Sequence, residues 1–303
     1  MLAMAAGGGS PSLAVVARRD TLATQAARIA LASALLCPTL APRACDAAVE
    51  GAYARLKATW WFQHDTFEPV LATAAFATWL AMWYLVDVLH HARIPRRFKV
   101  QPTERSMEHW KPEGHVAQQV LLYLVPIALY DRVKPRRVLP EHAPTAAACI
   151  GQVALSLLLY DCLFAVFHAA MHNHPALYAL HAKHHQSSVV RARDAVRVSV
   201  LEQLVDVSCS IWALKLSGSH PLCRAMHNVV ITYLIAELHA GYRFPWMLER
   251  VVPFGLVMGP TKHIAHHANG APHYAKFCAF LDPHYLHRAY QWLSGTRRVV
   301  LKQ

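Results

Sequence analysis

The sequence predicts an all-α fold, an integral membrane helical bundle of about three or four transmembrane helices with a histidine-rich dimetal site at the membrane–cytosol face. Composition is the first observation behind this prediction. Of 303 residues, 55% are hydrophobic and only 16% are charged, whereas soluble proteins carry about a quarter charged residues. The second observation is a series of long apolar runs without the period-two alternation of β-strands. The third is a set of histidines gathered in three short groups.

Residues 1–50 differ from the rest of the chain and predict an N-terminal tail or a targeting-like segment. They are rich in alanine, contain several arginines and have few acidic residues, as in many transit segments. A weakly apolar helix is expected at residues 29–40, and Pro38 and Pro42 disfavour a long span there. Residues 51–303 are then the membrane-embedded domain, with the candidate site between residues 161 and 270.

Five apolar runs follow and supply the predicted bundle. Residues 69–89 are long enough to cross a bilayer, and so are residues 143–170. The run at residues 116–130 is shorter and contains a proline, which fits a kinked span or a re-entrant segment. Residues 201–216 and 229–238 are shorter still and carry acidic residues, so we expect them in the interface or against the bundle.

The basic residues suit a membrane surface rather than a nucleic acid. Lysine and arginine exceed aspartate and glutamate by 30 to 18. They cluster in residues 93–99 and 132–137, directly after apolar runs, and form no continuous stripe with interleaved aromatics. Flanking clusters of this kind are typical of membrane helices. We therefore expect no nucleic-acid partner, and a re-entrant segment at residues 116–130 would put both clusters on the cytosolic side.

The cysteines predict no disulfide framework. The chain has seven of them, none in a CxxC pair, and most lie inside apolar runs. An odd number scattered in this way is typical of small buried side chains in a reducing or lipid environment.

Three histidine boxes are the candidate metal ligands. Their spacings are HxxxH, HxxHH and HxxHH, which place the rings of each box on one face of a helix. Neutral imidazole binds zinc, copper, iron and nickel, and eight nitrogens exceed the needs of one tetrahedral ion. We therefore expect two metal ions close together. The ligands in chain order are His168, His172, His181, His184, His185, His263, His266 and His267.

Asp161 precedes the first box on the same helical face, seven positions before His168 and eleven before His172. An ionisable residue in an apolar span is costly and predicts a function. We expect its carboxylate to accept a hydrogen bond from a ligand histidine and to orient that ring. An ion pair with a nearby arginine is the alternative.

The donor set favours oxygen chemistry over hydrolysis. A zinc hydrolase signature, HExxH, is absent from the sequence. Iron with open coordination positions activates dioxygen, and a lipid with an unactivated C–H bond needs an oxidant of that strength. The residues therefore indicate hydroxylation or desaturation of a lipid, and they do not separate iron from zinc.

At these motifs the chain resembles the fatty acid hydroxylase/sterol desaturase superfamily, the non-haem di-iron membrane oxygenases of the endoplasmic reticulum. The resemblance covers roughly residues 70–300 and includes its cholesterol-hydroxylating branch at residues 184–188 and 239–246. The superfamily's boxes are matched by all eight box histidines. Further matches are Asp161, Phe164, Leu177, Tyr178 and Lys183.

This resemblance implies an enzyme, with two iron ions, dioxygen, a sterol-like lipid substrate, and electrons from NAD(P)H through cytochrome b5 or a reductase. It makes His239 a possible ninth ligand, with packing against Trp246 as the alternative, and His273 a further candidate. Ile264 stands where relatives commonly have aspartate. The endoplasmic reticulum is the expected membrane, with a plastid or another organelle as alternatives.

Other outcomes stay open. The same boxes serve C-4 sterol methyl oxidases, lipid desaturases and fatty-acyl hydroxylases. Ile264 and the altered segment around Leu281 and Asp282 also allow a catalytically silent membrane scaffold.

Overall fold

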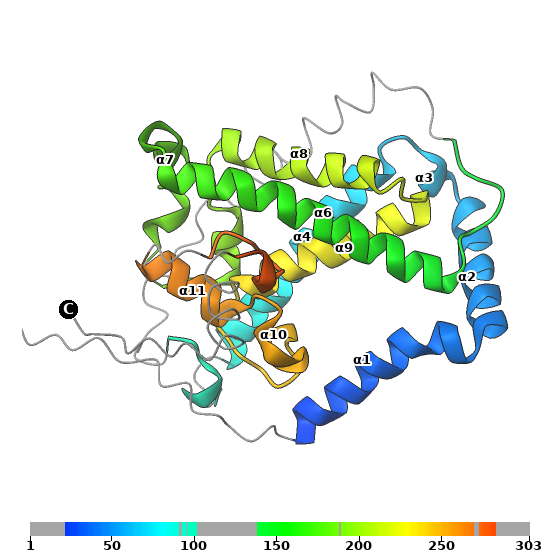
Figure 1. Ribbon diagram of the computed structural model, residues 1–303, viewed down its shortest axis with the longest axis horizontal. Helices are drawn as coiled ribbons and strands as arrows, with labels where there is room; N and C mark the ends of the chain where they lie inside the picture. The colour runs from blue at the N-terminus through cyan, green and yellow to red at the C-terminus, as the bar shows by residue number, and fades with distance from the viewer. Residues whose placement is uncertain are drawn as a thin grey trace, which may run out of the picture.

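The computed structural model describes residues 22–90, 93–94, 96–101, 138–187, 189–269 and 273–282. Within these ranges the regular structure is helical, with two isolated β-bridges, Lys99 with Tyr242 and Val257 with Cys278 (Figure 1). The predicted all-helical fold is therefore confirmed for the described part of the chain. The predicted segment at residues 116–130 lies outside the described residues.

The α-helices, in chain order, are α1 (Leu22–Leu40), α2 (Pro42–Lys57), α3 (Trp60–Gln63), α4 (Phe67–His90), α6 (Ala146–Asn173), α7 (Pro175–His181), α8 (Val200–Leu216), α9 (Pro221–Leu238), α10 (Leu248–Val251) and α11 (Pro260–Asn269). Short 3-10 turns are η2 (Arg96–Phe98), η3 (His184–Gln186), η4 (Ala192–Val196), η5 (Pro253–Gly255) and η6 (Ala279–Leu281).

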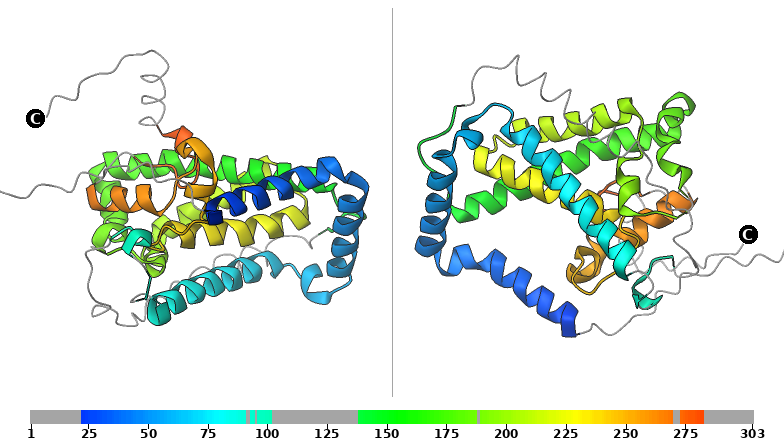
Figure 2. Two further views of the ribbon diagram at one scale, coloured as in Figure 1. Left: turned by 90° about the horizontal axis from the view of Figure 1, so that it is seen from below. Right: turned by 180° about the vertical axis from the view of Figure 1, so that it is seen from behind.

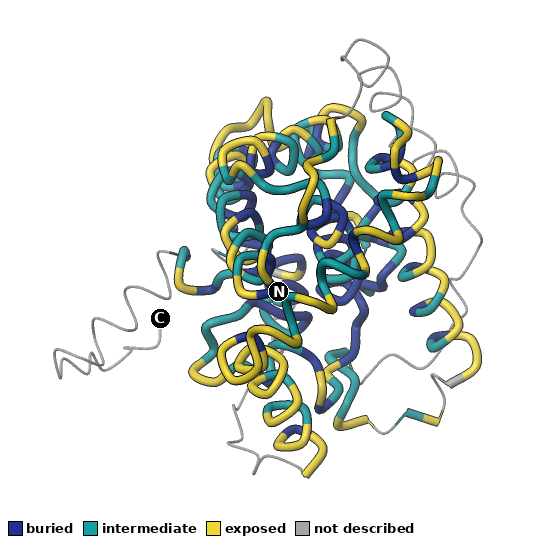
Figure 3. Tube along the Cα trace, turned by 90° about the vertical axis from the view of Figure 1, so that its right-hand side faces the viewer, coloured by how far each residue is buried: buried dark blue, intermediate teal, exposed yellow. Residues whose placement is uncertain are grey.

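Four long helices form the bundle. Helix α9 lies between α4 and α6, and α8 packs along α6 (Figure 2). Their facing sides carry the largest hydrophobic cluster, which includes Trp83 of α4, Tyr160 and Phe164 of α6, and Ile235 of α9. Buried residues follow the inside of the bundle and exposed residues cover its outer faces (Figure 3).

Two helices are long and apolar enough to cross a membrane, judged by length and composition within the described residues. They are Phe67–Leu89 in α4 and Ala146–Asn173 in α6, which match the runs predicted at residues 69–89 and 143–170. The other two predicted runs form α8 and the second half of α9. Helix α9 is largely buried between its neighbours, so its apolar side chains pack against protein.

The N-terminal region is helical from residue 22. Helix α1 extends the helix predicted at residues 29–40 toward the N-terminus and contains Pro38 in its last turn. Pro42 opens α2, where its missing N–H and fixed φ suit the first helical position. The boundary predicted at residue 50 lies inside α2. Arg28 holds α1 to α10, because its guanidinium donates to the carbonyls of Arg250 and Val251 at 3.0 Å each.

Helix α6 carries the first box at its far end. Thr145 caps its start by accepting from the backbone N–H of Ala148, and Asp46 of α2 accepts from the N–H of Ala146 at 2.8 Å. The helix ends before Pro175, which cannot continue it. The chain then reverses through α7, so the second box returns against the first.

A buried polar triplet fixes the relative positions of three bundle helices. The ring of His227 on α9 lies 2.8 Å from Ser156 Oγ of α6 through Nδ1 and 3.1 Å from Ser210 Oγ of α8 through Nε2. His227 is fully buried. Both its nitrogens contact hydroxyl groups, so this histidine is a structural residue and not a metal ligand.

Candidate metal centre

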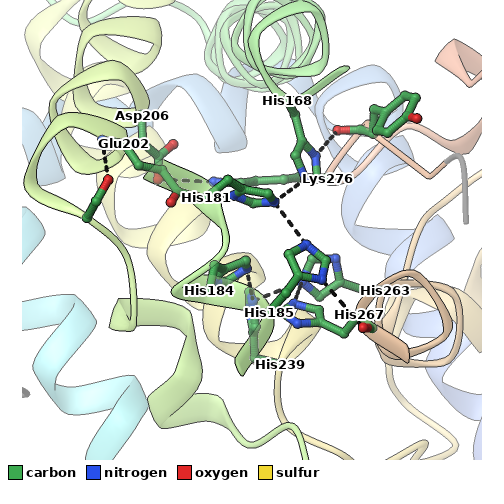
Figure 4. A network of polar contacts seen from close by, with 12 residues as sticks. His168, His181, His184, His185, Glu202, Asp206, His239, His263, His267 and Lys276 are labelled. Carbon is green, nitrogen blue, oxygen red and sulfur yellow. Dashed lines mark hydrogen bonds and ion pairs between the residues drawn. The ribbon is translucent and has the colours of Figure 1, made fainter. Parts of the chain in front are cut away.

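Among the described residues, nine histidines converge at the end of the bundle where α6, α7, η3, α9 and α11 meet, and Figure 4 shows part of this cluster. They form two groups, and the ligand nitrogens within each group lie within 4.8 Å of one another. The five-histidine group is His168, His172, His181, His185 and His266. The four-histidine group is His184, His239, His263 and His267. The predicted convergence of the three boxes is therefore found, and His239 joins them.

Nε2 atoms meet at short distances inside both groups. In the five-histidine group, His181 Nε2 lies 3.1 Å from His168 Nε2 and 2.9 Å from His185 Nε2. In the four-histidine group, His263 Nε2 lies 2.9 Å from His239 Nε2 and 3.1 Å from His267 Nε2. Ligands at right angles around an ion with bonds of about 2.1 Å have nitrogens about 3.0 Å apart. The spacing therefore fits coordination of a common ion in each group.

The opposite nitrogens of two rings show which atoms are free to bind. His168 Nδ1 lies 2.8 Å from the Tyr274 carbonyl, and His239 Nδ1 lies 2.8 Å from the Ile235 carbonyl. A carbonyl only accepts, so Nδ1 carries the proton and Nε2 keeps its lone pair. Lone pairs about 3 Å apart repel one another unless a cation lies between them. His172 Nε2 is also buried without a hydrogen-bond partner in the described structure, as expected of a metal ligand.

Burial keeps the rings of the second box neutral. It lowers the pKa of His184 well below the usual value, and the neighbouring His267 and His239 lower it further. Burial and the neighbouring His181 lower the pKa of His185 to about 4. Since a metal binds only the unprotonated nitrogen, these rings are ready to bind a cation at neutral pH.

Glu202 holds His181 from behind. Its Oε1 lies 2.7 Å from His181 Nδ1, and both side chains are buried. Ser199 caps the first turn of α8 and so places Glu202 there. A carboxylate behind a ligand histidine fixes its tautomer and makes it a stronger ligand. No local sequence pattern indicates this role, because Glu202 lies outside the second box and the two are joined only by the packing of α7 on α8.

The hydrogen-bond partner predicted for Asp161, a ligand histidine, was wrong. Its carboxylate accepts three backbone N–H groups, from Lys276 at 2.6 Å, Phe277 at 3.0 Å and Cys278 at 2.6 Å, rather than a ligand histidine. The reason is that His168 Nδ1 is already occupied by the Tyr274 carbonyl. Asp161 thus fixes the segment that follows α11, and this segment in turn presents the carbonyl to His168.

His273 belongs to neither histidine group. Its Nδ1 lies 3.6 Å from a carboxylate oxygen of Asp282, and it is absent from both sets of converging nitrogens. The alternative proposed for His239 also differs from the structure, since Trp246 stacks on Phe244 while His239 faces His184 and His263. Ile264 is buried on α11.

A narrow cavity lies beside both groups, between α6, α8 and α9. Five of the histidines line it, together with apolar Phe164 and Ile235 and the polar Glu202, Asp206 and Lys276. Lys276 Nζ donates to Tyr160 Oη at 2.8 Å and to Asp206 Oδ2 at 3.0 Å. The cavity is large enough for water and too small for a sterol ring system.

Comparisons with known proteins agree with this site. A sequence model of the fatty acid hydroxylase family matches residues 153–285, which include all nine histidines. Human cholesterol 25-hydroxylase is 33% identical over 225 residues, covering 73% of this chain and 82% of the relative. A zebrafish (Danio rerio) relative, cholesterol 25-hydroxylase-like protein 1, member 2, is 30% identical over 247 residues, covering 77% and 87%.

A more distant relative is the cholesterol 25-hydroxylase-like protein of Caenorhabditis elegans, 26% identical over 230 residues, which cover 71% of this chain and 73% of the relative. Among solved structures, none matches the chain. The extent and identity of the human and zebrafish matches, together with the matched histidine region, show that this chain belongs to the fatty acid hydroxylase family.

Proposed function

We propose that this protein is a membrane-embedded, dioxygen-dependent di-iron oxygenase that hydroxylates a sterol-like lipid. The observation that carries the proposal is the convergence of nine imidazoles in two adjacent groups, at the end of a helix able to cross a bilayer. Relatives named cholesterol 25-hydroxylase support a sterol as the substrate class.

The residues present fit a pair of iron ions. The five-histidine group would hold one ion and the four-histidine group the other. When bound, the two irons would supply dioxygen activation for insertion of oxygen into an unactivated C–H bond. Zinc binds the same donors, so the identity of the metal is part of the proposal.

The chain's own residues hold and orient these ligands. Glu202 and the Tyr274 carbonyl fix His181 and His168 in the five-histidine group. The Ile235 carbonyl fixes His239 in the four-histidine group. Because each of these three rings is held through Nδ1, its Nε2 is positioned before metal binds.

The reaction as a whole converts R–H, dioxygen, two electrons and two protons into R–OH and water. We propose that the electrons come from NAD(P)H through cytochrome b5 or a reductase on the cytosolic face of the endoplasmic reticulum. Basic side chains at this end of the bundle, including the exposed Arg96 and Arg97 after α4, would favour an acidic electron donor.

Desaturation, C-4 methyl oxidation and fatty-acyl hydroxylation use the same ligand set. The acyl alternative is favoured by the name of the matching family, fatty acid hydroxylase.

The experiment is turnover by the membrane-embedded protein with an electron-transfer system, on parallel panels of sterols and acyl lipids, read by mass spectrometry. The expected result is a sterol product heavier by one oxygen atom, labelled from ¹⁸O₂. His184→Ala should abolish it, whereas His142→Ala, at an exposed position, should not. Hydroxylated acyl lipid alone would shift the proposal to the acyl alternative, and a wild-type protein without bound metal would favour the scaffold.

A further inference from the structure

Two cysteine thiols meet at the corner between α1 and α2. The Sγ atoms of Cys37 and Cys45 lie 3.1 Å apart, and Cys37 is exposed while Cys45 is half-buried. The corner between them is fixed by backbone hydrogen bonds, since the N–H of Ala41 donates to the Cys37 carbonyl at 2.9 Å and the N–H of Cys45 donates to the Ala41 carbonyl at 3.1 Å. The approach of the thiols is therefore built by the local chain.

The corner lies at the opposite end of the bundle from the histidines. Asp46, the neighbour of Cys45, is bonded to the N–H of Ala146 at the start of α6. His168 is 22 positions further along the same helix, which corresponds to about 33 Å. The hydrocarbon core of a bilayer is about 30 Å thick. In Figure 1 the corner between α1 and α2 lies near the start of α6, whereas α7 and α11 lie near the opposite end of α6.

A helix that is long and apolar enough to cross the membrane therefore separates the two sites. The proposed function puts the histidines on the cytosolic face, where NAD(P)H supplies electrons, and the inference rests on that proposal for its sidedness. The cysteine corner then faces the lumen. Disulfides form and persist in that compartment, whereas cytosolic thiols are kept reduced.

We propose that Cys37 and Cys45 are joined by a disulfide in the mature protein. The two thiols lose two protons and two electrons, and one S–S bond forms. The electrons pass by thiol–disulfide exchange to a low-molecular-weight or protein disulfide of the lumen, which is reduced to two thiols. This differs from the reduced, buried state expected for the cysteines from sequence. Cys149, Cys209 and Cys223 are buried, as that expectation has it.

The bond would brace α1. One end of this helix is held by Arg28 against the carbonyls of α10, and the disulfide would fix the other end to α2. Helix α10 in turn contacts the segment that leads to the third box, because Glu249 accepts from the backbone N–H and the hydroxyl of Thr261 at the start of α11.

The test uses full-length protein in membranes whose free thiols are alkylated at lysis. Trypsin cleaves after Arg28, Arg43 and Arg55, so the two cysteines fall in separate peptides, residues 29–43 and 44–55. The expected result is a linked pair of these peptides without reductant and two separate peptides after reduction. Recovery of both as alkylated single peptides overturns the proposal. Cys209 is the control and should be recovered as an alkylated thiol.

A second measurement reports sidedness independently of catalysis. In Cys37→Ser the thiol of Cys45 is left single, and a membrane-impermeant maleimide should label it only after sealed vesicles with an outward cytosolic face are permeabilised. Labelling of Cys45 in intact vesicles would overturn the luminal placement. A protein that shows the linked peptides and luminal labelling but no turnover would retain this inference and lose the proposed function.

Discussion

Glu202 Oε1 lies 2.7 Å from His181 Nδ1, inside the protein and behind the five-histidine group. The contact joins the first turn of α8 to the end of α7, so an acidic residue from a separate helix sets the orientation of one ring of the second box. Burial raises the pKa of Glu202 to about 8. A cation on the far side of the imidazole would favour the carboxylate and strengthen the hydrogen bond.

Replacing Glu202 by glutamine should weaken metal binding by roughly 10- to 100-fold, the usual effect of losing a carboxylate behind a ligand histidine. The measurement is iron content per chain against free-metal concentration in purified protein. Glu141→Gln is the matched control, since its side chain is exposed. Equal metal affinity in the two variants would contradict the role given to Glu202.

His239→Ala and His273→Ala form a pair that tests the composition of the four-histidine group. Loss of His239 removes one of four converging nitrogens, so the metal content should fall from about two ions per chain toward one. His273 lies outside both groups, so its variant should keep the wild-type metal content. Metal analysis by mass spectrometry checks both, and the reverse pattern would show that the groups are wrongly assigned.

Asp161→Asn should destabilise the protein and loosen the ring of His168. An asparagine side chain has one acceptor oxygen, so at least one of the three buried N–H groups at residues 276–278 loses its good partner. The expected cost is about 1–3 kcal/mol, seen as a lower Tm in detergent. Metal content should also fall, because the Tyr274 carbonyl is carried by the same segment. An unchanged Tm would refute the anchoring role.

The metal-free protein should lose stability as the pH falls from about 6.5 to about 4. The pKa of His185 and that of His181 are lowered from 6.5 to about 4, mainly by burial. In this window the unfolded chain binds protons that the folded chain does not, so the free energy of unfolding decreases with decreasing pH. Tm measured across this range checks the prediction. Bound metal should be released over a similar range, because protons compete for the same nitrogens.

Gly241→Ala should destabilise the fold, whereas Gly51→Ala should not. Gly241 has φ +76, and a Cβ there would lie 2.4 Å from Arg191 Nη1 and 3.0 Å from the Val190 carbonyl. We expect a loss of about 1–3 kcal/mol from the strained backbone alone. Gly51 lies inside α2 with nothing within 4 Å of an added Cβ, so alanine should stabilise it by up to about 1 kcal/mol. Thermal unfolding of the two variants gives the comparison.

Local patterns sufficed for the long apolar helices and the eight box histidines. Helices α4 and α6 follow directly from the length and hydropathy of their runs, and HxxxH and HxxHH spacings place rings on one face wherever the chain is helical. His239 could be proposed as a ligand only from the family resemblance, because a single histidine at the end of a buried helix forms no recognisable spacing pattern.

Contacts between segments far apart in the chain could not be predicted from local sequence patterns. The partner of Asp161 depends on a loop more than a hundred residues away, and Glu202 reaches His181 only because α8 folds back against α7. Cys37 and Cys45 are a second example, with a much shorter separation in the sequence. Counting cysteines suggested no pairing, whereas the turn at Ala41 brings these two thiols into contact.

The Ser156–His227–Ser210 triplet has a mechanical consequence for how the narrow cavity beside the histidines can widen. Shifting α9 lengthwise by even one turn, about 5.4 Å, would break both imidazole–hydroxyl contacts in a setting that offers no replacement from water. Sliding among α6, α8 and α9 is therefore the costly motion. Widening of the narrow cavity must come from side-chain rotation or from sideways separation of the helices, with their relative heights unchanged.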